Sequence, residues 1–122
     1  MLNIIYQYTR AQALEDGVLI DVSEIAAESG FKYPTAVTAA VWNDYISWDD
    51  NERAYQDEAG RLWDVVYMAS IQLYRYKGSE AYYNFYSIPR GKMKAKLAKL
   101  KMVISAGDTP EPVITIMLPT ED

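Results

Sequence analysis

Hydrophobic positions in the middle of the chain follow the spacing of a helix. Between residues 61 and 77 the apolar side chains recur every three or four residues, as they do in a helix that packs one face against a core. This stripe consists of Leu62, Val65, Val66, Ala69, Leu73 and Tyr76. A second stripe beside it consists of Trp63, Tyr67, Ile71 and Tyr74. The pattern therefore predicts one long helix that is covered on two sides, in the core or at an interface.

Three later segments change to the spacing of β-strands. Residues 81–88 are dense in aromatic side chains, residues 97–105 contain a Met-Val-Ile run, and residues 112–118 alternate and are rich in β-branched side chains. The tetrapeptide Gly-Asp-Thr-Pro at 107–110 is a typical turn, so the last two segments are expected to form an antiparallel hairpin. Residues 92–101 also fit a short basic helix, and their spacing leaves both alternatives open.

Short helices separated by glycines are predicted in the first half of the chain. Thr9 and Gln12 have the spacing of a capping box, in which each side chain bonds the backbone of the other residue. Gly17 stands where a glycine commonly ends a helix, and a second short helix is predicted to end at Gly30. Residues 18–20 are too few for anything but a buried strand or a tight connection.

Helical spacing resumes after Pro34. From residue 35 onward the apolar positions at helical intervals are Val37, Val41, Tyr45 and Trp48. Residues 49–60 have no apolar periodicity and are expected to form an exposed acidic loop. We therefore expect an α+β fold in a single domain over residues 1–122, in which short N-terminal helices and one long helix pack on a C-terminal antiparallel sheet of about three strands.

Composition supports one folded domain and narrows the possible chemistry. The chain has 122 residues, of which 50% are apolar and 24% charged, as in an ordinary globular protein. It contains no histidine and no cysteine, so catalytic triads, thiolate nucleophiles and the usual zinc ligands are excluded. The glycines form no nucleotide-binding loop, and the acidic stretch lacks the spacing of a calcium loop. We expect a protein that is not an enzyme, with no catalytic, cofactor-binding or metal-binding residues.

Charge is distributed unevenly along the chain, whose net charge is −5. Residues 1–64 hold 12 acids and 4 bases, whereas residues 65–122 hold 5 acids and 8 bases. A polarised surface is expected if the two halves lie on different sides of the domain. Solvation of exposed side chains is the simpler explanation of the same pattern.

The second stripe of the long helix is the first candidate for binding. Tryptophan and tyrosine are enriched at the hot spots of protein interfaces, so Trp63, Tyr67 and Tyr74 are the predicted contacts with a protein partner. Core packing explains the same residues if they are buried.

Residues 74–101 combine basic and aromatic side chains and are the second candidate. Lysine and arginine bind phosphates, and aromatic rings stack on unpaired bases, so this combination suits a single-stranded nucleic acid. The candidate contacts are Tyr82, Tyr83, Arg90, Lys92, Lys94 and Lys96. Such residues also stabilise sheets and protect edge strands without any ligand, and the negative net charge opposes polyanions. Nucleic acid is therefore the alternative to a protein partner.

The sequence gives no sign of a membrane protein. It has no run of the roughly 18 apolar residues that span a bilayer, and its first residues lack the features of a signal peptide. We expect a cytoplasmic protein without membrane contact, and the sequence leaves the identity of the partner and the oligomeric state open.

Three segments together resemble a known family. They are YTRAQALEDGVLIDVS at residues 8–23, YQDEAGRLWDV at 55–65 and EPVITIMLP at 111–119, with residues 36–42 between them. The chain is similar over nearly its whole length to a family of small uncharacterised proteins carried by phages, plasmids and integrative elements. The resemblance implies an accessory protein of a mobile element, with an anti-defence or regulatory role as an expectation. It implies no activity, cofactor or catalytic residue.

Overall fold

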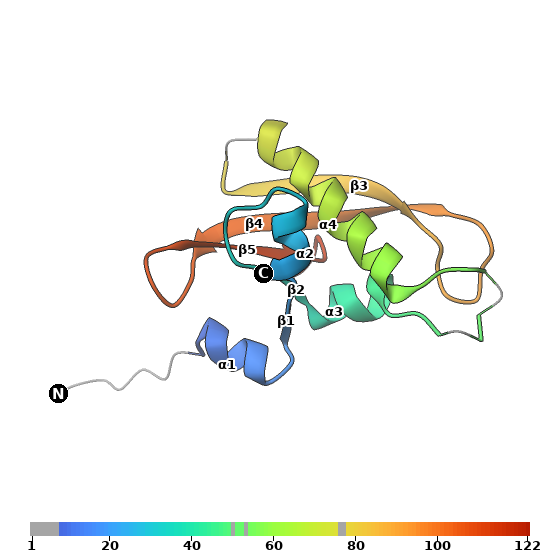
Figure 1. The fold of residues 1–122 in the computed structure, drawn as a ribbon, viewed down its shortest axis with the longest axis horizontal. Helices are drawn as coiled ribbons and strands as arrows, with labels where there is room; N and C mark the ends of the chain where they lie inside the picture. The colour runs from blue at the N-terminus through green and yellow to red at the C-terminus, as the bar shows by residue number, and fades with distance from the viewer. Residues whose placement is uncertain (1–7, 50, 53, 76–77) are drawn as a thin grey trace.

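Five strands from both halves of the chain form one sheet (Figure 1). The computed structural model describes residues 8–49, 51, 52, 54–75 and 78–122. The strands are β1 (Leu19–Asp21), β2 (Thr35–Thr38), β3 (Glu80–Ser87), β4 (Lys96–Ala106) and β5 (Pro112–Met117). Their order is β1-β2-β5-β4-β3, in which β2 and β5 are parallel and the other neighbours are antiparallel. The sheet is therefore mixed, and β3 is the last strand at one side.

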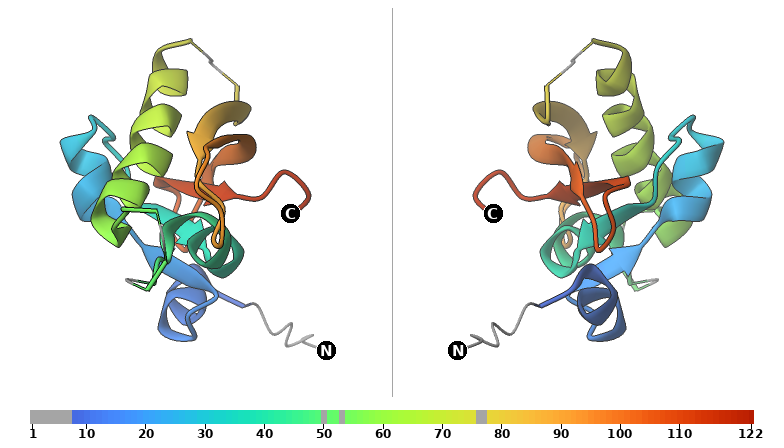
Figure 2. Two further views of the ribbon diagram at one scale, coloured as in Figure 1. Left: turned by 90° about the vertical axis from the view of Figure 1, so that its right-hand side faces the viewer. Right: turned by 90° about the vertical axis from the view of Figure 1, so that its left-hand side faces the viewer.

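The longest described helix lies across one face of this sheet. The described helices are α1 (Arg10–Glu15), α2 (Ser23–Glu28), α3 (Ala39–Val41), the π-helix η1 (Trp42–Ile46) and α4 (Glu58–Arg75). Figure 2 shows α2 and α4 on one side of the sheet and the C-terminal segment on the other. Helix α4 packs against β3, η1 and α2, so it joins elements from both halves of the chain.

The core lies between α4 and the sheet. Val65, Val66 and Ala69 are fully buried, and their spacing places them on one face of α4. Four strands contribute the opposing buried side chains, which are Val37, Ala81, Tyr83, Phe85, Leu100, Met102, Ile114 and Ile116. The hydroxyl of Tyr83 donates a hydrogen bond of 2.9 Å to the carbonyl of Val65, which fixes the position of α4 over β3.

The face of the sheet opposite α4 is covered over β5 and exposed over β3 and the first half of β4. Over β5, Arg10 donates hydrogen bonds to Thr115 Oγ1 at 2.7 Å and to the Ile114 carbonyl at 2.8 Å. Lys101 donates to the carbonyl of Glu121 in the C-terminal segment. Over β3 and the first half of β4 the outward side chains are exposed, and they are Glu80, Tyr82, Asn84, Tyr86, Leu97 and Lys99. We call these six residues the open face.

Several local predictions are confirmed. The three strands predicted in the last third are β3, β4 and β5, and the turn at 107–110 joins β4 to β5 in an antiparallel pair. Thr9 and Gln12 form the predicted capping box. Gly17 has a φ of 78°, which glycine adopts without the steric cost that other residues meet. The residues from Lys96 onward belong to β4, so the strand was the correct alternative for them.

The α+β class is confirmed, but the expected three-stranded antiparallel sheet with one long helix is wrong. The sheet also contains β1 and β2, whose 3 and 4 residues are too few for periodicity to reveal. All four positions of β2 are buried, so no alternation distinguishes this strand from the start of a helix. The helix predicted from residue 35 begins only at Ala39, after Thr38 accepts a cap bond from the Val41 N–H. The described residues form four α-helices and one π-helix.

A carboxylate from the β4–β5 hairpin holds the first turn of α1. Asp108 accepts backbone N–H bonds from Arg10 at 2.7 Å and from Ala11 at 3.0 Å. These N–H groups have no partner within the helix, and they carry the positive end of its dipole. Asp108 therefore joins two segments that are 98 residues apart in the chain.

Replacing Asp108 by alanine is expected to lower the free energy of unfolding by about 1–2 kcal/mol, because two helix N–H groups lose a charged acceptor. Urea unfolding followed by circular dichroism measures this change. Glu111→Ala is the control, because it removes an exposed carboxylate from the same hairpin and should stay within about 0.5 kcal/mol of the wild type. Equal stability of Asp108→Ala and the wild type would contradict the role of Asp108.

Candidate interaction surface

No strand in the described part of the chain pairs with the outer edge of β3, which we call the free edge. The Ile104 N–H donates to the Ser79 carbonyl at 2.7 Å, and the register continues without interruption along β3 and β4. In an antiparallel pair, hydrogen-bonded and non-bonded residue pairs alternate. The odd-numbered residues of β3 therefore bond to β4, and the even-numbered ones direct their N–H and C=O groups to the free edge. The even-numbered residues also carry the β3 side chains of the open face.

Two aromatic side chains of α4 are exposed on the same side of the molecule as this edge. The rings of Trp63 and Tyr67 stack with centroids 5.6 Å apart and planes 14° from parallel. Their exposed fractions are 37% and 45%, so both rings offer area to a partner. Each ring restricts the other, and little further side-chain entropy is lost when a partner binds.

A hollow of about 290 Å³ connects α4 with the edge of β3. It is lined by Asp64, Tyr67, Met68, Asn84, Phe85, Tyr86 and Leu97. We call it the edge hollow. Tyr67 and Met68 come from α4, whereas Asn84 and Tyr86 are edge residues of β3, so the hollow extends across the unpaired backbone.

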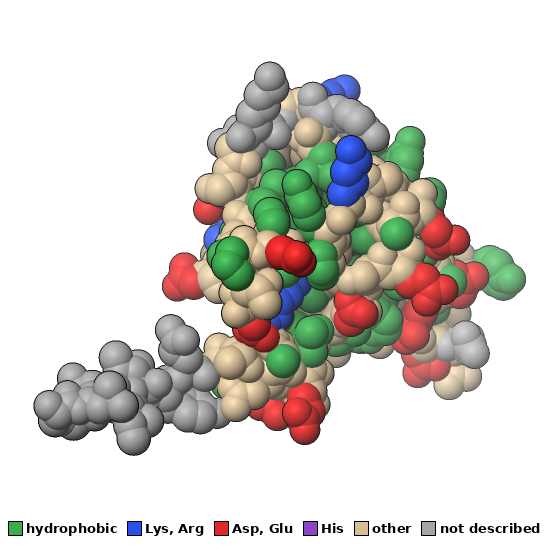
Figure 3. Space-filling model, turned by 60° about the vertical axis from the view of Figure 1, so that its left-hand side comes forward, with side chains coloured by type: hydrophobic (Ala, Val, Ile, Leu, Met, Phe, Trp, Pro, Cys, Tyr) green, Lys and Arg blue, Asp and Glu red, His purple; other side chains and the backbone are tan. Residues whose placement is uncertain are grey.

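Basic side chains gather at the end of the sheet where β3 ends and β4 begins. Strand β4 pairs with β5 only from Lys101 onward, so its first five residues extend beyond β5 together with β3. The exposed basic residues at this end are Arg90, Lys92, Lys94, Lys96 and Lys99. We call them the basic end. On the side that carries α2 and α4, acidic side chains are spread around a group of hydrophobic ones (Figure 3).

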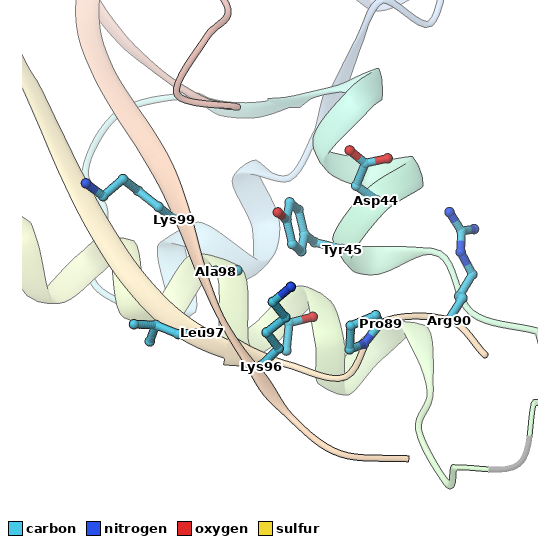
Figure 4. Close-up of a pocket in the computed structure, with 9 residues that line it drawn as sticks. Asp44, Tyr45, Pro89, Arg90, Lys96, Leu97, Ala98 and Lys99 are labelled. Carbon is cyan, nitrogen blue, oxygen red and sulfur yellow. The ribbon is translucent and has the colours of Figure 1, made fainter. Parts of the chain in front are cut away.

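A second hollow, of about 510 Å³, lies between η1 and the basic end. Its lining includes Asp44, Tyr45, Arg90 and Lys96. Figure 4 shows Lys96 pointing toward the Tyr45 ring, whereas Leu97 and Lys99 point away. Arg90 donates a hydrogen bond to the backbone carbonyl of Asn43, which ties the β3–β4 connection to η1.

A buried arginine connects the start of α4 to the end of β3. Arg61 is only 4% exposed, and its Nη1 donates to the Ile88 carbonyl at 2.9 Å. Its guanidinium carbon lies 4.4 Å from the centroid of the Trp48 ring. Burial lowers the pKa of Arg61, the charge of Arg90 lowers it further, and Asp64 acts in the opposite direction. Arg61 thus ties the start of α4 to the residue that follows β3.

The structure brings together two of the three predicted protein contacts. Trp63 and Tyr67 are exposed and stacked, whereas the side chain of Tyr74 lies outside the described part of the chain. Of the predicted nucleic-acid contacts, Tyr82 belongs to the open face. The others that are exposed are Arg90, Lys92, Lys94 and Lys96, all at the basic end.

Tyr83 is not a nucleic-acid contact, and this prediction is wrong. The ring is 2% exposed and lies on the face of β3 that α4 covers, with its hydroxyl bonded to Val65. Consecutive residues of a strand point to opposite faces, so Tyr82 and Tyr83 cannot both be exposed on one face. Because α4 covers the face of β3 that carries Tyr83, Tyr83 is the one of these two tyrosines that lies in the core.

Sequence reasoning missed Asn84, Tyr86, Leu97 and Lys99. Aromatic residues occupy both alternating sets of β3, so hydrophobicity alone did not separate the inner from the outer face. The polar residues Glu80 and Asn84 share their alternation with Tyr82 and Tyr86, and this was the signal that marks the outer set. Leu97 and Lys99 follow from pairing with Tyr86 and Asn84.

These features define an α+β protein with a mixed five-stranded sheet, an open edge strand and exposed aromatic side chains beside that edge. The chain belongs to a family of unknown function, DUF6573, whose family model matches residues 1–122. No curated protein and no solved structure is significantly similar to it. Among the described helices, none is long and apolar enough to cross a membrane. The described acidic residues form no group of three that could hold a metal ion.

Tyr83→Phe tests the link between α4 and β3. At neutral pH the variant is expected to lose about 1 kcal/mol of unfolding free energy with the hydroxyl hydrogen bond. Burial raises the pKa of Tyr83 well above its ordinary value, so the folded state disfavours the phenolate. The tyrosine therefore contributes full stability below its unfolded pKa of about 10 and loses it as the pH rises above that value.

Urea unfolding at neutral pH and at a pH of about 11 measures both effects. The wild type should lose more stability than Tyr83→Phe on going to the alkaline pH. Tyr86→Phe is the matched control, because Tyr86 is 71% exposed and its replacement should change neither value. Parallel losses in the wild type and in Tyr83→Phe would refute the assignment.

Proposed function

We propose that the protein is a non-enzymatic binding module that uses Trp63, Tyr67 and the edge of β3 to bind a protein partner. The observation that carries the proposal is the position of the stacked Trp63–Tyr67 pair and the edge hollow beside an unpaired strand. The sequence resemblance to proteins of mobile elements supports a setting in which such a module acts on a host or element protein. An anti-defence or regulatory role in the cytoplasm fits that setting.

The chemistry of this surface supports protein recognition. Tryptophan and tyrosine supply large contact areas with few rotatable bonds, and they dominate interface hot spots. Soluble proteins usually protect long edge strands with charges, prolines or covering segments. Between Glu80 and Ser87, β3 has no lysine, arginine or proline, and its single charge is Glu80 at the first position. Most of the strand therefore lacks this protection and suits a partner that covers it.

At the proposed surface, the arrangement of acidic residues suits binding better than catalysis, whereas Asp21, Glu24 and Glu28 share a different hollow of about 340 Å³. Asp64 lines the edge hollow and Asp44 lines the hollow at the basic end. Neither lining contains a second described carboxylate, whereas acid–base chemistry with carboxylates commonly uses a pair across one cleft. Burial raises the pKa of Asp64, and the Arg61 charge partly opposes this effect.

The double variant Trp63→Ala/Tyr67→Ala tests the proposal. The wild-type protein, attached to beads, is expected to capture a protein partner from nuclease-treated extract of its natural host, and mass spectrometry identifies it. With the purified partner, the double variant should bind at least about 30-fold more weakly, because hot-spot aromatics are worth about 2 kcal/mol or more. Interferometry measures the dissociation constants.

Tyr33→Ala is the matched control, because Tyr33 is an exposed aromatic at 44% that lies outside the proposed surface. Its affinity for the partner should remain within about twofold of the wild-type value. Unchanged capture by the double variant would exclude Trp63 and Tyr67 as the contact.

A second candidate function is the binding of single-stranded nucleic acid. The observation that favours it is the open face, where Tyr82 and Tyr86 are 48% and 71% exposed. The Lys99 ammonium lies 5.8 Å from the centroid of the Tyr82 ring. Two exposed aromatic rings and a cation on one sheet face suit base stacking with a phosphate contact.

The triple variant Lys92→Glu/Lys94→Glu/Lys96→Glu tests this second candidate. A fluorescent single strand of about 20 nucleotides should bind the wild type at about 50 mM salt and dissociate as the salt concentration rises. The triple variant should lose at least about tenfold in affinity by fluorescence anisotropy. Arg75→Glu is the control, because it changes an exposed charge at the end of α4. Absence of wild-type binding at low salt would dispose of the candidate.

A further inference from the structure

We propose that the partner adds an extended acidic segment to the free edge of β3 as a sixth strand. This inference rests on the proposed function, and it specifies how the partner binds and which chemistry it carries. Three features of the structure lead to it: the unpaired backbone of β3, the edge hollow and the basic end.

The backbone of β3 provides a row of hydrogen-bonding groups for another strand. The bond from Ile104 to Ser79 and the continuous register leave the N–H and C=O groups of the even-numbered residues directed outward. The residues with these outward groups are Glu80, Tyr82, Asn84 and Tyr86. Strand addition satisfies such groups with main-chain bonds, and side-chain pockets then select the sequence.

The edge hollow is placed to receive side chains of the added strand. Side chains of a strand alternate between its two faces. An added strand would therefore direct one set toward Tyr67 and Met68 on α4, and the other set toward Tyr82 and Tyr86 on the open face. The lining of the hollow is apolar except for Asp64 and Asn84, so we infer an apolar or aromatic residue at the position that enters it.

Charge at the end of β3 selects the class of partner. The five exposed residues of the basic end are all cationic, and the chain between Glu80 and Asp108 contains no acidic residue. An extended segment that continues past Ser87 would approach the β3–β4 connection, where Lys92 and Lys94 are exposed. These cations attract Asp and Glu side chains and increase the association rate at low salt. A second copy paired antiparallel through β3 would place only Glu80, the one acidic residue of that strand, beside the basic end of the first copy, so a segment with several acidic residues from another protein fits better.

Random peptides displayed on phage provide the probe. Peptides of about 10 residues, at roughly 3.3 Å per residue, are long enough to cover β3. Selection on the wild-type protein is expected to enrich sequences that alternate β-branched or aromatic residues with other residues, contain Asp or Glu at one end and lack proline. The enriched peptides are then synthesised, and their affinities are measured by fluorescence anisotropy.

Asn84→Pro removes an N–H that faces the free edge and leaves the pairing of β3 with β4 intact, as proline allows on edge strands. It is expected to weaken peptide binding at least about tenfold, because a main-chain bond is lost and the ring obstructs the added strand. Asn84→Thr keeps the N–H and favours strand geometry, but it changes a side chain that lines the edge hollow, so any loss that it shows measures the contribution of that side chain alone. Asn84→Pro should bind at least about tenfold more weakly than Asn84→Thr.

A second measurement leaves the protein unchanged. Each backbone nitrogen of a selected peptide is methylated in turn, and binding to the wild type is measured. Strand addition predicts that every second methyl group weakens binding at least about tenfold, because alternate N–H groups face β3. This pattern does not depend on the folding of a variant.

The outcomes separate this inference from the proposed function. One outcome is that Trp63→Ala/Tyr67→Ala abolishes capture of the protein partner, but methylation of the peptide nitrogens does not weaken binding at every second position. The protein then binds its partner through side chains, and strand addition is overturned. Failure to select any peptide, or selected peptides without acidic residues, would also overturn it. If an oligonucleotide binds equally to Asn84→Pro and to the wild type and no peptide binds, the second candidate function replaces the proposed one.

Discussion

The packing of α4 across β3 and β4 is the interaction on which the rest of the structure depends. Val65, Val66 and Ala69 close the core over the sheet, and the hydrogen bond from Tyr83 to the Val65 carbonyl fixes the helix at one position along β3. Because α4 covers one face of β3, the alternation of the strand assigns every other side chain to the opposite face. The exposed aromatics and the edge hollow are consequences of that placement, whereas the free edge follows from the position of β3 as the last strand of the sheet.

Charged side chains are distributed unevenly around this surface. The basic residues that are scattered over the second half of the sequence come together where β3 and β4 extend beyond β5. Acidic residues spread over the side that carries α2 and α4 (Figure 3). A partner therefore meets a local positive potential at the end of β3, although the whole chain has a net charge of −5.

The candidate surface could be predicted in part. Trp63 and Tyr67 stand out in the sequence because a helix with two apolar stripes must cover both or leave one exposed. The choice between these alternatives depends on what packs beside α4, and that element is β3, which has no described strand on its outer side. Tyr82 and Tyr83 have the same chemistry, so their own residue type does not distinguish them. The polar residues Glu80 and Asn84 mark the alternating set of Tyr82 as the outer one, and α4 covers the set of Tyr83.

The sequence by itself determined the long helix, the three C-terminal strands, the hairpin turn and the capping box, because each depends on contacts within a few residues or on a periodicity sustained over many. Tertiary structure alone decided the incorporation of β1 and β2, the parallel pairing of β2 with β5 and the position of β3 at the edge. Strands of 3 and 4 residues are stabilised only by neighbours that lie far away in the chain. Their local sequence therefore carries too little information to identify them.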